Sequence, residues 1–412
     1  MCFGFFLLQT FKKMVYYNSG EIIMRFSNLM DTFSEGIFAN LNNKKLALEA
    51  RGKKVYDLFV GTPDFKPDSS ILNAMQKALE DPNNIKYSLH DMDILKDRFI
   101  KHYKDRFHVS LNRNQIMTVN GTQEGMCHIG MLLANPGEYC LLPDPGYVAF
   151  TASAKFARLN IITYPLLEEN DFMPRLDLLD SSVLKKIKYV IISYPSNPTG
   201  GVINKERYIE IIELARKYGF IIVNDNAYSD IIFDHNESFS FLSLPYAFEV
   251  GCEFYSLSKS YNTTGARISF FLGSEEIVSK FNTLRSQYDF GMFYPIQYAA
   301  IAALDVDKNI IEAQRHEYEL RRNTLCDGLS SIGWKVNRSK GTMFVFAKIP
   351  DKYEDSLEFA EDLLEKTGVL CTPGSAFGTL GKKYVRFALV KPVEELQEII
   401  RIIDESGILK NS

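Results

Sequence analysis

The sequence predicts an α/β fold in which helices cover a mostly parallel, seven-stranded sheet, joined to a smaller α+β domain. Seven short apolar runs alternate with helical or loop segments between residues 116 and 272. Near-continuous apolar character is typical of parallel strands that are buried on both faces. After residue 330 a shorter alternation of strands and helices predicts the second domain. The seven runs cover residues 116–119, 139–142, 160–163, 189–193, 220–223, 253–256 and 268–272.

The composition is that of a globular protein with a large core. Of the 412 residues, 46% are hydrophobic and 24% are charged, and a chain of this length is expected to form two or three domains. The net charge of −4 argues against a nucleic-acid partner, because binding a phosphate backbone requires a basic patch.

The cysteines and histidines are dispersed. The six cysteines form no CxxC pair, which predicts free thiols, a reducing compartment and a cytoplasmic location. The six histidines are scattered, and no cluster has the spacing of metal ligands, so we expect no metal site.

Residues 1–23 are expected to form a poorly ordered extension, or to precede a second start at Met24. The apolar stretch at residues 3–8 comes before Lys12 and Lys13, whereas a signal peptide has its basic residues first. The stretch is also far too short to span a bilayer, so we expect no membrane partner.

The remaining chain is expected to divide into three parts. Residues 24–60 form an N-terminal arm with part of the small domain, through a helix over 28–50 and a strand over 55–60. Residues 61–305 form the large domain, which opens with a turn at Gly61 and a helix that Asp68 caps. Residues 306–412 supply a connecting helix and the rest of the small domain. Its strands are expected at 343–347, 369–371 and 384–389, and its helices at 309–329, 356–366 and 393–403.

Polar or aromatic residues follow five of the predicted strands, at the edge where parallel sheets bind ligands. Gly121 and a helix start follow the first strand, and their free N–H groups form a ready anion site. Tyr147, Asn197, Asp225 with Tyr228, and Lys259 follow four others. Each position alone has a plainer interpretation as a cap, a tight turn or a surface loop. Their convergence on one edge favours a binding site.

The stretch over residues 254–268 carries the most specific chemistry. Desolvation at the end of a buried strand disfavours the ammonium of Lys259, and a neutral amine forms Schiff bases with carbonyls. Ser256, Ser258 and Arg267 offer a phosphate hydroxyl donors and a charged fork. An amine that can react with an aldehyde, placed beside donors for a phosphate, is the arrangement expected of a pyridoxal phosphate site.

Two charged residues have two interpretations each. Asp225 follows an apolar strand, so its carboxylate is either a helix cap or a buried charge that needs a cation such as a pyridinium N–H. Arg386 lies inside a strand-like run, where it either reaches outward or faces a carboxylate.

The combination of motifs resembles the class I and II pyridoxal-phosphate-dependent aminotransferases, which have the aspartate aminotransferase fold, also called fold type I. The resemblance extends over residues 24–407. It implies transfer of an amino group between an L-amino acid and a 2-oxo acid, in a homodimer whose active sites are shared between subunits. The matching motifs are Asn197-Pro-Thr-Gly-Gly, Asp225-Asn-Ala-Tyr, Ser256-Leu-Ser-Lys-Ser with Arg267, and Pro373-Gly-Ser-Ala-Phe-Gly followed by Tyr384-Val-Arg.

The resemblance implies a role for each matching residue. Lys259 would form the Schiff base and move the proton at the substrate Cα, and Asp225 would keep the pyridine nitrogen protonated. Arg386 would bind the substrate α-carboxylate together with Gly61 and Asn197. Around the cofactor, Tyr228 and Asn197 would bind the ring oxygen, Tyr147 would stack on the ring, and Gly121, Thr122, Gln123, Ser256, Ser258 and Arg267 would hold the phosphate.

Two stretches depart from the family pattern. Tyr87 would reach the phosphate in the partner subunit's site, but the glycine expected after it is missing. The segment over residues 287–293 resembles the one that crosses into the partner's site in the diaminopimelate-type branch, with Gln287 and Phe290 in place of Asn and Ser. No second arginine for a side-chain carboxylate is evident, so the substrate stays open.

Two other functions also stay open. A β-lyase that cleaves C–S bonds would use the same cofactor and release pyruvate and ammonia without an oxo-acid acceptor. A non-catalytic, cofactor-binding regulator would carry an added DNA-binding domain, for which residues 1–23 are too few and not basic enough.

Overall fold

The computed structural model describes residues 24–33 and 36–410, and the chain falls into two units, Met1–Ser34 and Glu35–Ser412. In the first unit the described residues include a 3-10 helix over Met30–Thr32. The expectation for residues 1–23 lies outside the described residues. All features below belong to the second unit.

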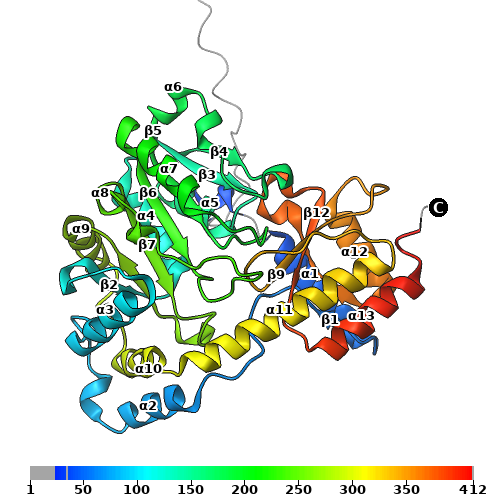
Figure 1. The fold of residues 1–412 in the computed structure, drawn as a ribbon, viewed down its shortest axis with the longest axis horizontal. Helices are drawn as coiled ribbons and strands as arrows, with labels where there is room; N and C mark the ends of the chain where they lie inside the picture. Colours follow the sequence, from blue (N-terminus) through cyan, green and yellow to red (C-terminus); the bar gives the residue numbers. More distant parts are fainter. Residues whose placement is uncertain (1–23, 34–35, 411–412) are drawn as a thin grey trace, which may run out of the picture. The chain divides into compact units, whose positions relative to one another are not determined.

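A seven-stranded sheet forms the centre of the second unit (Figure 1). Its strand order is β2-β8-β7-β6-β5-β3-β4, and all neighbours are parallel except those of β8, which is antiparallel to β2 and β7. Each predicted apolar run coincides with one strand, so the predicted fold class is confirmed. The strands are β2 (Ile116–Val119), β3 (Tyr139–Asp144), β4 (Asn160–Pro165), β5 (Ile187–Ser193), β6 (Ile221–Asn226), β7 (Gly251–Ser256) and β8 (Ser269–Leu272).

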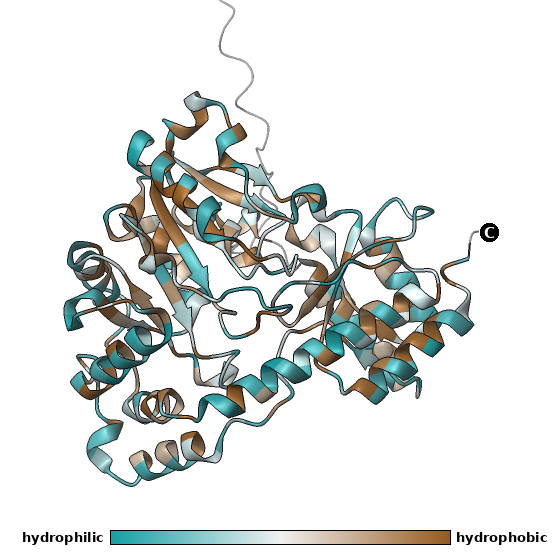
Figure 2. Cartoon of the chain, viewed as in Figure 1, coloured by the Kyte–Doolittle hydropathy of each residue, from teal (hydrophilic) through white to brown (hydrophobic). Residues whose placement is uncertain are grey.

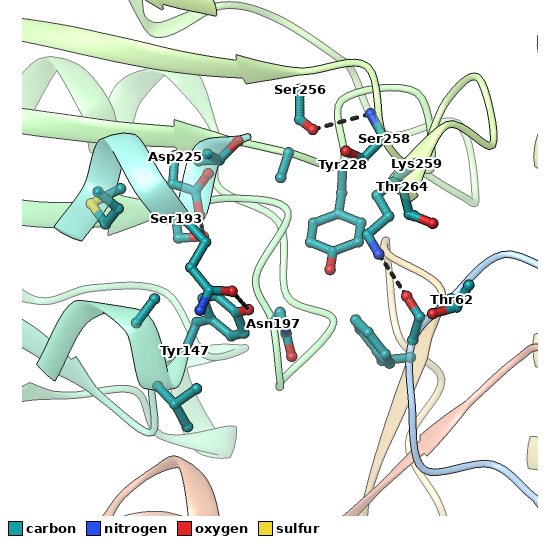
Figure 3. A pocket seen from close by; sticks show the side chains of 18 of the residues that line it. Thr62, Tyr147, Ser193, Asn197, Asp225, Tyr228, Ser256, Ser258, Lys259 and Thr264 are labelled. Carbon is teal, nitrogen blue, oxygen red and sulfur yellow. Dashed lines mark hydrogen bonds between the residues drawn. The ribbon is translucent and has the colours of Figure 1, made fainter. Parts of the chain in front are cut away.

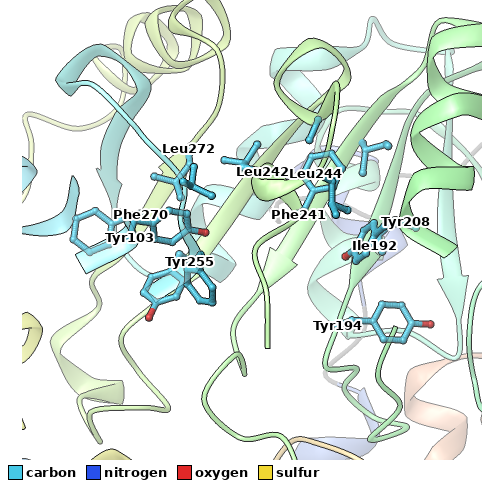
Figure 4. Packing of buried hydrophobic residues seen from close by; sticks show 14 of the residues in the cluster. Tyr103, Ile192, Tyr194, Tyr208, Phe241, Leu242, Leu244, Tyr255, Phe270 and Leu272 are labelled. Carbon is cyan, nitrogen blue, oxygen red and sulfur yellow. The ribbon is translucent and has the colours of Figure 1, made fainter. Parts of the chain in front are cut away.

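Helices cover both faces of this sheet because successive strand residues point to opposite sides. Val190 and Ile192 of β5 join one buried cluster with residues of α3 (Asp93–Phe107), α7 (Lys205–Tyr218) and α10 (Tyr294–Leu304). Figure 4 shows part of this cluster, including Tyr103 and Tyr208. Tyr189 and Ile191 join a second cluster with α4 (Thr122–Leu133), α5 (Val148–Phe156) and α9 (Glu275–Arg285). The remaining helices of this region are α2 (Ser69–Leu79), α6 (Ser181–Leu184) and α8 (Ala247–Val250).

A smaller α+β region combines both ends of the second unit. Strands β9 (Phe344–Lys348), β11 (Thr372–Pro373) and β12 (Tyr384–Ala388) form an antiparallel sheet in the order β11-β12-β9. Strand β1 (Tyr56–Asp57) pairs in parallel with β10 (Val369–Leu370). The helices here are α1 (Gly36–Ala50), α12 (Ser356–Thr367) and α13 (Val393–Ser406), and the 24-residue α11 (Lys308–Ser331) leads into the region (Figure 1).

Several expected elements have different limits in the structure. The helix expected over 28–50 begins at Gly36, and the strand expected over 55–60 is reduced to Tyr56 and Asp57 because its only strand partner, β10, has two residues. The helix expected after Asp68 is confirmed, with the Asp68 carboxylate accepting a hydrogen bond of 2.8 Å from the Ser70 N–H. The boundary expected at 305/306 lies between α10 and α11, and the three-part division stays a prediction.

The outer helices carry many polar residues, while the central strands are apolar along much of their length (Figure 2). Within the described ranges, no helix combines the length and the apolar character needed to cross a membrane. The same ranges contain no group of three or more His, Cys, Asp or Glu side chains placed to hold a metal ion. The cysteines from Cys127 onward are free thiols, and Cys2 lies outside the described residues.

Candidate active site

A cavity of about 420 Å³ lies where the carboxyl ends of β5, β6 and β7 meet the segment after β1 and strand β12 (Figure 3). All of the predicted site residues line it except Gly121 and Tyr87. The sheet supplies residues at its strand ends because parallel neighbours in register terminate at one edge. Of the predicted site residues that line the cavity, Gly61 and Arg386 come from outside the seven-stranded sheet and its connecting segments.

Lys259 projects into this cavity from the loop after β7. Its Nζ donates a hydrogen bond of 2.6 Å to the carbonyl oxygen of Gly61. Burial, together with the smaller effects of the nearby charges of Arg386 and Arg267, lowers the pKa of Lys259 to about 8. The amine is therefore neutral in a much larger fraction of molecules at neutral pH than a solvated lysine would be.

Of the two interpretations of Asp225, the structure supports the second: its carboxyl group is buried and caps no helix. Asp225 lies within the last residues of β6, paired in register with Ser193 of β5 and Phe254 of β7. Its Oδ2 accepts a hydrogen bond of 3.3 Å from Ser193 Oγ, while Oδ1 is buried and has no hydrogen-bond partner among the described residues. Burial raises the pKa of Asp225 to about 7.

Arg386 is buried and faces inward rather than toward solvent. Its Nη1 donates to Asn197 Oδ1 at 2.8 Å, and its Nη2 donates to the Phe59 carbonyl at 2.9 Å and to Thr372 Oγ1 at 3.2 Å. No carboxylate is among its contacts in the described chain, and its Nε has no partner there. Burial lowers the pKa of Arg386 to about 10. Burying a guanidinium without a counter-charge is energetically costly, so this position is suited to bind an anionic group of a ligand.

Donors for an anion converge at the start of α4. Gly121 precedes the helix with a positive φ of 83°, and a Cβ built on it would lie 2.3 Å from Arg267 Nη2. The hydroxyls of Thr122, Ser269 and Ser256 form a chain with separations of 3.2 and 3.3 Å. Gly121 does not line the cavity itself, but its lack of a side chain is what lets the Arg267 guanidinium approach the helix start.

Aromatic side chains flank the centre of the cavity. Tyr147 donates from its hydroxyl to Gln123 Oε1 at 2.9 Å, so two residues predicted to bind the cofactor contact each other. Tyr228 is buried against Phe344, with ring centroids 5.8 Å apart. Burial raises the pKa of both tyrosine hydroxyls, which keeps them protonated as hydrogen-bond donors.

The two stretches that depart from the family pattern pack against each other, away from this chain's cavity. Tyr87 is 77% exposed and its ring lies 5.0 Å from that of Phe290, which is 62% exposed. Ser88 Oγ donates to the Met292 carbonyl. Gly291 has a φ of +116°, and a Cβ there would lie 1.9 Å from the Ser88 carbonyl oxygen. Within one subunit, Tyr87 therefore does not join the other predicted site residues.

Some residues that contact predicted site residues were not themselves predicted. Phe59 and Thr372 accept hydrogen bonds from Arg386, and Ser193 donates to Asp225. Ser193 ends a predicted strand one position before Tyr194, so the rule that strand ends carry ligands could have identified it. Phe59 contributes its backbone carbonyl, and a motif of side-chain types cannot identify a backbone contact.

Comparisons with known proteins identify the family of this chain. The sequence pattern of the family described as aminotransferase class I and II matches residues 53–403. The chain is 38% identical over 381 residues to the LL-diaminopimelate aminotransferase of Aquifex aeolicus, a match that covers 91% of this chain and 97% of that protein.

Solved structures are similar over nearly the whole chain. Apo-BacF from Bacillus subtilis superposes with a TM-score of 0.91 and 31% identity, covering 95% of this chain and all of that one (100%). A probable N-succinyldiaminopimelate aminotransferase from Thermus thermophilus gives a TM-score of 0.85 and 32% identity, with coverages of 90% and 100%.

Proposed function

The chain belongs to the class I and II aminotransferases, so it is a pyridoxal-phosphate-dependent enzyme that exchanges amino groups between amino acids and 2-oxo acids, and we propose that Lys259, Asp225 and Arg386 carry this reaction. The observation that supports the assignment is their convergence on one cavity from three separate elements. An amine, a carboxylate and a guanidinium there match the three polar groups that the reaction presents: an aldehyde, a pyridine nitrogen and an α-carboxylate.

The buried polar groups fit pyridoxal phosphate. The unpaired Oδ1 of Asp225 would accept a hydrogen bond from the protonated pyridine nitrogen, which supplies the cation that this buried carboxylate lacks. Tyr147 would pack on the ring, and Asn197 with Tyr228 would bind its oxygen. The phosphate would be held by the N–H groups at the start of α4 and by the side chains of Thr122, Gln123, Ser256, Ser258 and Arg267.

Lys259 provides both the attachment and the proton transfer. Its lowered pKa leaves a larger fraction of the amine neutral and nucleophilic at neutral pH, so Nζ would hold the cofactor through its aldehyde carbon. Nζ would also move the proton at the substrate Cα. When bound, pyridoxal phosphate serves as the sink for the electrons that this proton leaves behind.

Arg386 orients the substrate. Its planar fork can bind an α-carboxylate with two parallel hydrogen bonds, and the carboxylate supplies the missing counter-charge. Phe59 and Gly61 accept hydrogen bonds from Arg386 and Lys259 respectively, so the intervening Val60 lies between the carboxylate and amine positions. We propose that the substrate's side chain leaves the reacting carbon near Val60, which lines the cavity.

The wall that this chain offers to a substrate side chain is mainly apolar. Val60 and Val148 line the cavity and are 54% and 36% exposed. Within the described chain, the only cations that line the cavity are Lys259, Arg267 and Arg386, and each already has a proposed task. We propose that uncharged side chains are accepted by this wall, and that the charged distal end of diaminopimelate, named for the relatives, would need a group from a second subunit.

A homodimer is part of the proposal. Tyr87 and Phe290 are large, exposed and paired, and they lie on the two stretches that resemble segments crossing to the partner's site. Exposed aromatic pairs of this kind are typical of interaction surfaces. The cytoplasmic location expected from the dispersed cysteines stays a prediction.

A half-reaction screen tests the function. The purified protein is loaded with pyridoxal phosphate and mixed singly with the common L-amino acids and with LL-diaminopimelate, and the loss of the cofactor's visible band is followed. An aminotransferase bleaches with its donor and recovers the band when a 2-oxo acid is added. Pyruvate and ammonia released without an acceptor would identify a β-lyase instead. Absence of any lysine-dependent band, with Lys259→Ala indistinguishable from wild type, would refute the proposed site.

A further inference from the structure

We propose that Ser260, Asp230 and Arg106 form a positioning clamp, here called the Asp230 clamp, that holds Lys259 in register with Tyr228. The proposal rests on the function proposed above for Lys259. None of the three residues lines the cavity, so they act through the residues that do.

The clamp joins the two loops that carry the site. Ser260 directly follows Lys259, is 1% exposed, and donates from Oγ to Asp230 Oδ2 at 2.5 Å. Asp230 lies two residues after Tyr228. The loop after β7 and the loop after β6 are thus joined by one short hydrogen bond next to their functional side chains. A charged acceptor makes such a bond roughly twice as strong as a neutral one.

Arg106 anchors the clamp to a helix. The second oxygen of Asp230 pairs with Arg106 Nη2 at 2.5 Å, and the Asp230 side chain is 8% exposed. The same nitrogen lies 3.4 Å from the Ser229 carbonyl and from Ser238 Oγ. Arg106 belongs to α3, which packs on the sheet, so the position of Asp230 is set by the rigid scaffold rather than by the loops themselves.

A separate contact holds the other side of Lys259. Gln314 of α11 donates from Nε2 to the Lys259 carbonyl at 3.0 Å, and it accepts from Asn262 Nδ2 at 2.8 Å. With its own carbonyl and the next side chain both bonded, the Lys259 backbone has little freedom. The amine must reach both a cofactor carbon and a substrate carbon, and a misplacement of about 1 Å can reduce such a reaction roughly a hundredfold.

Two variants with matched controls separate positioning from general stability. Ser260→Ala removes one buried hydroxyl next to Lys259, and Ser356→Ala removes a buried, hydrogen-bonded hydroxyl at the start of α12. Asp230→Asn weakens the pairing with Arg106, and Asp234→Asn weakens the pairing with Arg322 farther along the same loop. Thermal unfolding of all four variants reports any general loss of stability.

The first readout is the apparent pKa of Lys259 in the full-length, cofactor-stripped protein. It is measured from the pH dependence of acetylation by acetic anhydride, read on the Lys259 peptide by mass spectrometry. Ser260→Ala frees the amine to reach water, so its pKa should rise by about one unit toward the ordinary value. Asp230→Asn should also raise the pKa of Lys259, because the clamp is lost. Loss of the negative charge without any movement of Lys259 would instead lower that pKa.

The second readout is the single-turnover rate of the loaded enzyme with its best donor, which should fall roughly tenfold in both clamp variants and stay unchanged in both controls. The clamp is refuted if Ser260→Ala leaves the Lys259 pKa unchanged, or if Ser356→Ala shifts it equally. A lowered pKa in Asp230→Asn would refute positioning by that residue. Should the wild-type protein react with no donor, the proposed function fails, while the acetylation readout still decides on the clamp.

Discussion

Lys259 Nζ donates a 2.6 Å hydrogen bond to the carbonyl oxygen of Gly61, a residue 198 positions earlier in the chain. The contact joins the loop after β7 to the segment that also supplies the Phe59 carbonyl to Arg386. The amine and the guanidinium are therefore positioned by one stretch of three residues. The chemistry of the site depends on this stretch being held between the sheet and the small α+β region.

The pKa of Lys259 predicts how fast the stripped protein takes up its cofactor. Only the neutral amine attacks an aldehyde, and burial lowers this pKa to about 8. The uptake rate, followed by visible absorbance from about pH 6 to about pH 10, should rise with pH and level off above about 8. A rate that still climbs steeply near pH 10 would indicate a solvated lysine. Lys259→Ala provides the blank.

Replacing Arg386 should affect the substrate more than the cofactor. Arg386→Gln keeps a polar side chain but removes the charge and the fork, so kcat/KM for the best donor should fall at least about a hundredfold. Arg386→Lys keeps the charge without the planar fork and should recover only part of the loss. Cofactor binding, measured by titration of the stripped protein, should change little in either variant. Equal losses in both measurements would place Arg386 at the cofactor instead.

Asp225 should destabilise the cofactor-free chain at high pH. In the folded chain the pKa of Asp225 is raised from 3.8 to about 7. The stabilisation that the protonated carboxyl gives the folded state is therefore complete below about pH 4 and is lost as the pH rises to about 7. Asp225→Asn mimics the protonated form. In urea unfolding of the stripped protein, the variant should match wild type near pH 4 and exceed its free energy of unfolding by up to about 4 kcal/mol at pH 8.

With the cofactor bound, we expect wild type to outperform Asp225→Asn, the reverse of their order in stability without it. The variant has no carboxylate for the pyridine nitrogen, so it should bind the cofactor more weakly and lose most of its half-reaction rate at pH 8. A variant that is less stable than wild type in the stripped state at pH 8 would contradict the buried, uncompensated carboxylate.

Gly121→Ala should weaken cofactor binding through Arg267. The added Cβ would lie 2.3 Å from Arg267 Nη2, so the guanidinium must leave the phosphate position. Gly137→Ala is the matched control, because Gly137 has a φ of +86° against +83° for Gly121 and nothing lies within 4 Å of its Cβ position. Both variants carry similar backbone strain, about 1 kcal/mol, but only Gly121→Ala should raise the cofactor's dissociation constant, by roughly tenfold or more. Equal effects would attribute the change to strain alone.

Sharing of the site between subunits can be tested by complementation. In a mixed dimer of Lys259→Ala and Tyr87→Ala chains, one of the two sites combines an intact Lys259 with an intact Tyr87 only if Tyr87 acts across the interface. Random reassortment of two inactive homodimers should then restore about a quarter of wild-type activity. No recovery, with the hybrid verified by native mass spectrometry, would place Tyr87 in its own subunit's site or outside both.

Much of the fold and most of the site could be predicted locally. The apolar runs around Val190, Ile222 and Phe254 are short because a strand needs few residues to cross the sheet, and they are apolar because both faces are covered. Asp225 and Lys259 follow such runs, so their place at the ligand-binding edge followed from topology. The shortened strand at Tyr56 could not be predicted, because its length depends on β10, more than three hundred residues later.

By itself, the sequence determined the mostly parallel sheet, the identity of the chemical groups at its edge and the motifs that identify the family, since these follow from hydrophobic periodicity and residue type. The tertiary structure alone decided that Asp225 is a buried charge rather than a helix cap, and that Arg386 faces inward with no carboxylate partner among the described residues. Burial and hydrogen-bond partners arise from packing between distant segments. The tertiary structure also decided the contact of Lys259 with Gly61 and the pairing of Tyr87 with Phe290. Loops and backbone carbonyls have no periodic signal, so their positions are set by the elements that they connect.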